Sequence, residues 1–133
     1  MIIVEGKIVG KQRPRLGKYG TYTPTKTKQY EELIRREYKK QNGEFFEKGI
    51  PVKVIIYAYK KPCKSTTKKE LRLIEAGLNK WTKKPDIDNI TKSVLDSLNK
   101  VAYEDDGQVT CLKVYKRYTL QQERIEIEVK EDK

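Results

Sequence analysis

Six carboxylates lie within 21 residues of a chain that is otherwise strongly basic. Segment 86–106 carries six acidic and two basic side chains, and Asp86 and Asp88 stand two residues apart at the expected start of a helix. Carboxylate oxygens are the ligands that Mg²⁺ and Mn²⁺ prefer in proteins. A divalent ion neutralises phosphate oxygens and lowers the pKa of its bound water. The segment therefore predicts metal-dependent cleavage of a phosphodiester.

The same residues also have structural explanations. An Asp at the start of a helix is most often an N-cap, and the run 104–107 is typical of a turn. Lys92 lies one helical turn after Asp88, where it could hold the scissile phosphate or simply pair with Asp88 or Asp96. The spacing alone leaves both interpretations open.

The composition excludes several kinds of catalytic site. The 133 residues include no histidine, which excludes histidine general bases, histidine-dependent nucleophilic triads and nearly all zinc chemistry. Cys63 and Cys111 lie far apart and match neither a metal-binding nor a disulfide pattern. The N-terminus has no signal-peptide pattern and the longest apolar run, 54–59, is six residues. We therefore expect a cytoplasmic protein with no membrane partner.

The overall charge predicts a polyanionic partner. Thirty Lys and Arg against nineteen Asp and Glu give a net charge of +11, which favours nucleic acid. A protein that only coats phosphates gains nothing from the carboxylates of segment 86–106, because each repels the nucleic-acid backbone. A metal-dependent nuclease and a non-catalytic basic nucleic-acid-binding protein are the two competing interpretations.

Hydrophobic periodicity predicts one small α+β domain over residues 1–133. We expect a mixed or antiparallel sheet with about three helices. The apolar run 52–59 is typical of a central strand covered on both faces. A basic loop over 11–22 precedes the first helix, which starts at Thr23-Pro24 and stops at Asn42-Gly43. The other elements are strands at 2–9, 109–118 and 124–130 and helices over 67–78 and 88–100.

The helix over 88–100 has two distinct faces. Its apolar side chains recur on one face, which we expect to pack on the sheet: Ile90, Val94, Leu98 and Val101. Its polar residues share the opposite face: Asp88, Lys92, Asp96 and Asn99. The chain then returns to a strand near Val109, so we expect the second acidic run, 104–106, beside this helix or at the end of the sheet.

Residues 84–109 carry a recognisable pattern. It consists of Lys-Pro-Asp-Ile-Asp-Asn-Ile-Thr-Lys over 84–92, then Asp96, then Tyr-Glu-Asp-Asp-Gly-Gln-Val over 103–109. This pattern closely resembles the RusA family of Holliday junction resolvases, which are small phage- and prophage-associated endodeoxyribonucleases. Segments 10–15 and 21–24 support the resemblance, since they look like the loop that precedes the first helix in many members.

The resemblance implies roles for particular residues. Asp86, Asp88 and Asp106 correspond to metal-binding catalytic aspartates that use Mg²⁺ or Mn²⁺, and Lys92 corresponds to an essential lysine. Asp105 stands beside Asp106, which leaves two candidates for the third ligand. The resemblance also implies a homodimer that places paired, symmetric nicks across a four-way junction, because two equivalent strands suit a two-fold dimer.

DNA contacts follow from the same resemblance. Lys11, Arg13 and Arg15 in the basic loop, with Lys83 and Lys84 before the third helix, would contact the phosphate backbone. Aromatic residues in these loops are candidates for stacking on unpaired bases: Tyr19, Tyr22 and Trp81. A nuclease for flaps, forks or RNA would share the chemistry and differ only in substrate.

Overall fold

The computed structural model describes residues 1–12, 15–18, 20–22 and 24–133, with the backbone alone for residues 15, 21 and 22. The strands are β1 (Ile2–Glu5), β2 (Arg15–Gly17), β3 (Gly20–Tyr22), β4 (Val52–Lys60), β5 (Val109–Tyr118) and β6 (Arg124–Glu131). The helices are α1 (Thr25–Lys40), α2 (Lys68–Glu75), α3 (Ile87–Leu98) and a 3₁₀ turn, η1 (Asp106–Gln108).

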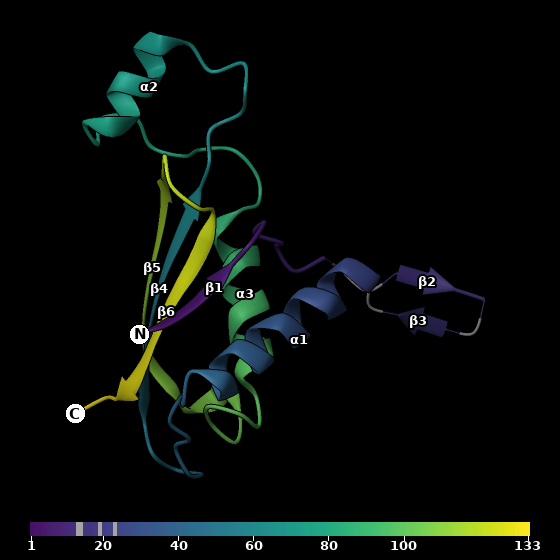
Figure 1. Cartoon of the computed structure of the whole chain (residues 1–133). Coiled ribbons are helices and arrows are strands. Elements are labelled where there is room, and N and C mark those ends of the chain that lie inside the picture. The colour runs from purple at the N-terminus through teal and green to yellow at the C-terminus, as the bar shows by residue number, and fades with distance from the viewer. Residues whose placement is uncertain (13–14, 19, 23) are drawn as a thin grey trace.

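Four strands form the main sheet, in the order β1-β6-β4-β5. β4 runs antiparallel to β6 and parallel to β5, and β6 runs antiparallel to β1. Because parallel neighbours need a long crossover, the chain between β4 and β5 has room for α2 and α3 (Figure 1). The predicted α+β class with a mixed sheet is confirmed.

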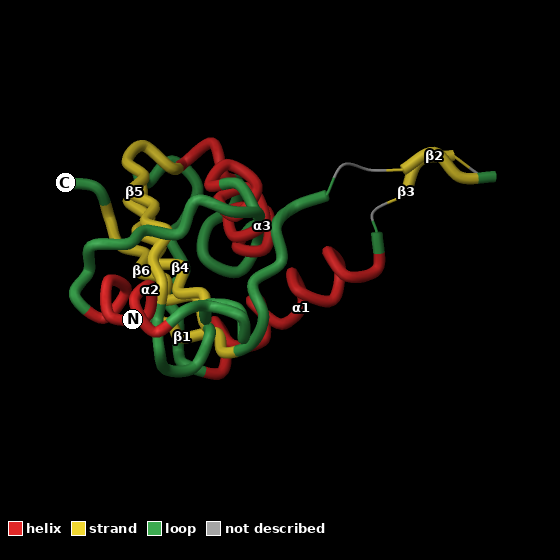
Figure 2. The backbone as a smooth tube through the Cα atoms, turned by 90° about the horizontal axis from the view of Figure 1, so that it is seen from above, coloured by secondary structure: helices red, strands yellow, loops and turns green. Residues whose placement is uncertain are grey.

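The core lies between this sheet and two helices. Figures 1 and 2 show α1 and α3 side by side on one face of the sheet. The predicted apolar stripe of α3 is confirmed for Ile90, Val94 and Leu98, which are fully buried. The helix ends at Leu98 and not near 100, so Val101, predicted on this stripe, lies beyond it. Every second side chain of β4 faces them and is also fully buried: Val52, Val54, Ile56 and Ala58. Removal of these apolar surfaces from water is the main stabilising contribution.

The opposite face of the sheet differs from the expectation. We predicted that β4 would be covered on both sides, but α1 and α3 share one face and α2 lies beyond one end of the sheet (Figure 1). Tyr57 instead stacks on Tyr115 and Tyr59, with ring centroids 5.0 Å and 6.3 Å away. Aromatic side chains that pack across neighbouring strands shield one another. A strand with apolar or aromatic residues on both faces can therefore lie in a sheet that helices cover on one face only.

Part of the predicted N-terminal loop forms a β-hairpin. Within the predicted loop 11–22, β2 and β3 pair as an antiparallel hairpin, which projects away from the sheet beyond the start of α1 (Figures 1 and 2). Gly20 has a φ of 111°, which only glycine adopts without strain. The predicted strand 2–9 ends at Glu5, because Gly6 has a φ of 121° and turns the chain.

Helix α2 begins where the sequence predicts but ends early. The Thr67 hydroxyl accepts a hydrogen bond from the Glu70 N–H at 3.2 Å, as expected for an N-cap. The helix stops at Glu75, and Leu78, expected on its apolar stripe, is 75% exposed. None of the helices in the described part of the chain is long and apolar enough to span a membrane.

Candidate functional site

Two of the predicted carboxylates stand at the start of α3. Asp86 is the N-cap residue, but its side chain makes no capping hydrogen bond. Its Oδ2 instead lies 2.8 Å from Nζ of Lys84, and the Asp86 side chain is 48% exposed. Asp88, in the first turn, accepts a hydrogen bond from the Asn89 N–H at 3.0 Å. Helix capping therefore does not account for the Asp86 carboxylate.

The two neighbouring acids after α3 differ in their contacts. Asp105 is the N-cap of η1: its Oδ2 accepts from the Gly107 N–H at 2.9 Å, and Gln108 Oε1 accepts from the Asp105 N–H at 3.2 Å. This reciprocal pair is a capping box. The Asp105 carboxylate thus has a structural task, which favours Asp106 as the third ligand predicted from the resemblance.

The electrostatic neighbour of Asp106 is at the far end of α3. Burial, followed by the charges of Asp105 and Asp96, raises the pKa of Asp106 above its ordinary value. Asp96 lies eight residues after Asp88, which is about 12 Å along a helix axis. The charge that α3 contributes to the pKa shift of Asp106 is thus that of Asp96, and the described residues contain no group of three His, Cys, Asp or Glu side chains placed to hold a metal ion.

Replacing Asp106 by Asn should raise thermal stability slightly at pH 7. The raised pKa means that the folded state disfavours the ionised carboxyl of Asp106. The protonated carboxyl therefore adds to the free energy of unfolding below the ordinary pKa of 3.8, and this contribution is lost as pH rises through the raised pKa of the folded state. Asn removes the repulsion from Asp96 and Asp105. Because Asp106 is partly exposed, we expect a gain below about 1 kcal/mol. Thermal unfolding at pH 7 with and without Mg²⁺ checks this, and a lower melting temperature without metal would contradict it.

The Lys92 side chain is exposed on α3, one helical turn after Asp88. This side chain forms no hydrogen bond or ion pair with any described residue, so the pairing with Asp88 or Asp96 that the sequence left open is not observed. Its ammonium group can meet a phosphate without first breaking an ion pair. The role of Lys92 as an essential lysine stays a prediction.

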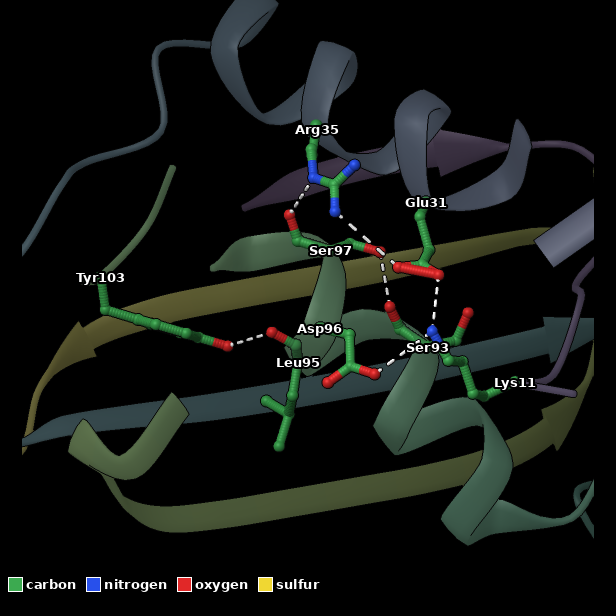
Figure 3. Close-up of polar contacts among 8 residues, drawn as sticks. All are labelled: Lys11, Glu31, Arg35, Ser93, Leu95, Asp96, Ser97 and Tyr103. Carbon is green, nitrogen blue, oxygen red and sulfur yellow. Dashed lines mark hydrogen bonds and ion pairs between the residues drawn. The ribbon is translucent and has the colours of Figure 1, made fainter. Parts of the chain in front are cut away.

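A partly buried ionic network ties α1 to α3 (Figure 3). Nζ of Lys11 lies 2.7 Å from Oε1 of Glu31 and 3.4 Å from Oδ2 of Asp96, and the Lys11 side chain is 15% exposed. Arg35 donates from Nε to the Ser97 carbonyl at 3.0 Å and lies 3.8 Å from Glu31. Lys11 was predicted to contact DNA; in this structure it is engaged inside the protein, and the DNA contact stays a prediction.

The charges of this network outweigh the cost of burying Lys11. Burial lowers the pKa of Lys11, but the hydrogen bond and charge of Glu31 and the charge of Asp96 raise it by more, so the net shift is upward. The sequence analysis did not single out Glu31. The available signal was an acid within the apolar stripe of α1, among Tyr30, Ile34 and Tyr38.

The segment around Gly10 packs directly on the start of α3. The Lys11 N–H donates to the Asn89 carbonyl at 2.9 Å. A Cβ atom on Gly10 would lie 2.7 Å from Cβ of Pro85 and 3.2 Å from Cβ of Asn89, so only glycine permits this approach. The base of the N-terminal basic region is thereby fixed beside Asp86 and Asp88.

The other predicted DNA contacts are placed only in part. Arg13 lies outside the described residues, and for Arg15 the structure describes the backbone alone. Lys83 and Lys84 are exposed on the segment that enters α3. Among the stacking candidates, Tyr19 lies outside the described residues and only the backbone of Tyr22 is described, while Trp81 is 3% exposed. The DNA contacts of these residues stay predictions.

Comparison with known proteins identifies the family. The family model described as "Endodeoxyribonuclease RusA" matches residues 5–130. The chain belongs to the RusA family. A protein of Bacillus subtilis (strain 168), described as "Uncharacterized protein YqaN", is 35% identical over 134 residues, which cover 96% of this chain and 93% of that protein. The RusA resemblance of segment 84–109 is confirmed and extends over nearly the whole chain, so the family activity is that of an endodeoxyribonuclease.

Proposed function

We propose that this RusA-family protein is a structure-selective endodeoxyribonuclease that resolves four-way DNA junctions by paired, symmetric nicks. The observation that carries the proposal is the start of α3. Asp86 and Asp88 stand there in a chain of net charge +11, and neither forms a buried ion pair. Such carboxylates can recruit a cation and so support phosphodiester cleavage without histidine.

The donor set fits Mg²⁺ or Mn²⁺. Mg²⁺ is usually held by one or two carboxylates and keeps several waters, a set that Asp86 and Asp88 can supply. In our proposal Asp106 would serve as the third ligand, although in this structure the described residues do not bring it into one metal-binding group with Asp86 and Asp88. The ion, when bound, supplies positive charge to the phosphate and a water of lowered pKa. Lys92 holds a phosphate oxygen near these aspartates, and Lys83 and Lys84 contact the flanking backbone.

We further propose that the protein acts as a homodimer in the cytoplasm. A four-way junction offers two equivalent strands, and a two-fold dimer brings one site to each. Two other interpretations compete with this one. A non-catalytic basic nucleic-acid-binding protein would use the carboxylates only to cap helices and neutralise neighbours. The Asp86 carboxylate makes no capping bond, and its one ionic partner, Lys84, is exposed. A nuclease for other branched DNA differs only in substrate.

Cleavage of a synthetic four-way junction beside a linear duplex of the same sequence tests the proposal. We expect paired nicks in the junction with Mg²⁺ or Mn²⁺, none in the duplex, and none with EDTA. Equal cleavage of forks and flaps would assign the protein to other branched DNA. Tight binding without cleavage under any divalent metal would favour a binding protein. The ionic strength is held constant, because phosphate contacts make affinity steeply salt-dependent.

A further inference from the structure

A pocket of about 560 Å³ opens beside Asp86, between the start of α3 and the end of β5. Its apolar lining comes from Trp81, Ile87 and Val114, and its basic lining from Lys80, Lys116 and Arg117. The volume falls within the range of pockets that hold small organic ligands. The pocket therefore combines apolar surface with a cationic rim next to a proposed metal ligand.

The strand that borders the pocket offers free backbone groups. Residues 114–117 of β5 line it, and β5 is an outer strand that pairs only with β4 among the described strands. An outer strand presents unpaired N–H and C=O groups along one side. A nucleobase has flat apolar faces and polar edges. Its faces suit the apolar side chains of the pocket, and its edges suit the row of backbone donors and acceptors.

Lys116 fixes the wall of the pocket. Its Nζ donates to the Lys83 carbonyl at 2.7 Å and lies 4.5 Å from the centre of the Trp81 ring. The segment that leads into Asp86 is thus tied to β5. The indole N–H of Trp81 has no acceptor among the described residues. Lys80 and Arg117 are both exposed at the rim, and the Arg117 guanidinium lies 4.9 Å from the centre of the Tyr115 ring.

We propose that this pocket receives one unpaired nucleotide of a DNA branch point, with its base against Ile87 and Val114 and its phosphate toward Lys80 and Arg117. This inference rests on the proposed function, because Asp86 forms part of the wall. A base must leave the helical stack to enter, which costs least where it is already unpaired. The pocket would then favour branched over linear DNA at the cleavage site itself.

Binding to junctions that lack single bases tests the inference. Wild-type protein is titrated in EDTA, where no cleavage occurs, against four-way junctions with an abasic site at each nucleotide next to the crossover. Loss of the base that enters the pocket should weaken binding roughly tenfold, which is the scale of losing one buried apolar contact. 2-Aminopurine at the same position should brighten on binding as it leaves the stack.

Two double variants with the same charge change separate the pocket from general phosphate attraction. Lys80→Gln with Arg117→Gln alters the rim, and Lys64→Gln with Lys113→Gln alters exposed lysines outside it. We expect the rim variant to bind the intact and abasic junctions equally, whereas the control variant keeps the tenfold difference. Ile87→Ala, which removes apolar lining, should also reduce that difference.

Three outcomes are decisive. If wild-type protein binds every abasic junction as tightly as the intact one, the pocket does not hold a base, and metal-dependent junction cleavage would still support the proposed function. If no junction is cut under any divalent metal while base-dependent binding persists, the proposed function fails and the pocket stands. If the rim variant changes from dimer to monomer in light scattering, the pocket belongs to a subunit interface and the inference is overturned.

Discussion

Replacing Asp88 by Asn should reduce junction cleavage by roughly 10³-fold or more while leaving junction binding unchanged or tighter. Asn keeps the size of the side chain. It also keeps an oxygen that can accept the hydrogen bond that the Asn89 N–H donates to Asp88 Oδ1 at 3.0 Å. It loses the negative charge that a divalent cation needs. The same change removes one repulsion against phosphate, so DNA affinity should not fall.

Single-turnover cleavage of a labelled junction at saturating protein, with gel-shift binding in EDTA, separates the two effects. Asp105→Asn is the matched control, because Asn can still cap η1 through its side-chain oxygen. That variant should cleave at close to the wild-type rate. Wild-type cleavage by Asp88→Asn would remove this aspartate from the site. Loss of cleavage in Asp105→Asn with retained stability would transfer the third-ligand role from Asp106 to Asp105.

Replacing Glu31 by Ala should lower the free energy of unfolding by about 2–4 kcal/mol. Glu31 is 7% exposed and faces both Lys11 and Arg35. Without its carboxylate, the ammonium of Lys11 keeps only the longer contact with Asp96, at 3.4 Å, and two cations are left close together. Removing one partner of a buried ion pair costs more than the pair contributes, because the remaining charge is uncompensated.

Urea denaturation followed by circular dichroism measures this loss. Glu32→Ala is the matched control: Glu32 is the next residue of α1 and is exposed, so its loss should change stability by less than about 0.5 kcal/mol. Equal unfolding midpoints for the two variants would show that the network contributes nothing. Because Lys11 also contacts Asp96 on α3, we expect Glu31→Ala to slow junction cleavage even where the protein remains folded.

The sequence was most informative where the signal is local. The start of α3 followed from the acids and proline of segment 84–88, and its core face from the spacing of Ile90, Val94 and Leu98. Strands β4, β5 and β6 followed from their apolar patterns. The RusA resemblance likewise depended on short motifs. Such signals need only neighbouring residues, so they can be read without knowing how the chain packs.

The amino-acid types thus specify the available chemistry: carboxylates for a cation, an excess of basic residues for DNA, and no histidine. Which of these groups come into contact depends on the packing of the helices and strands. This packing brought the charge of Asp96 to bear on Asp106, and it enclosed Lys11 between Glu31 and Asp96. It also left one face of the sheet to a tyrosine stack. These pairings join residues distant along the chain, and their geometry depends on how helices and strands pack, which local periodicity does not specify.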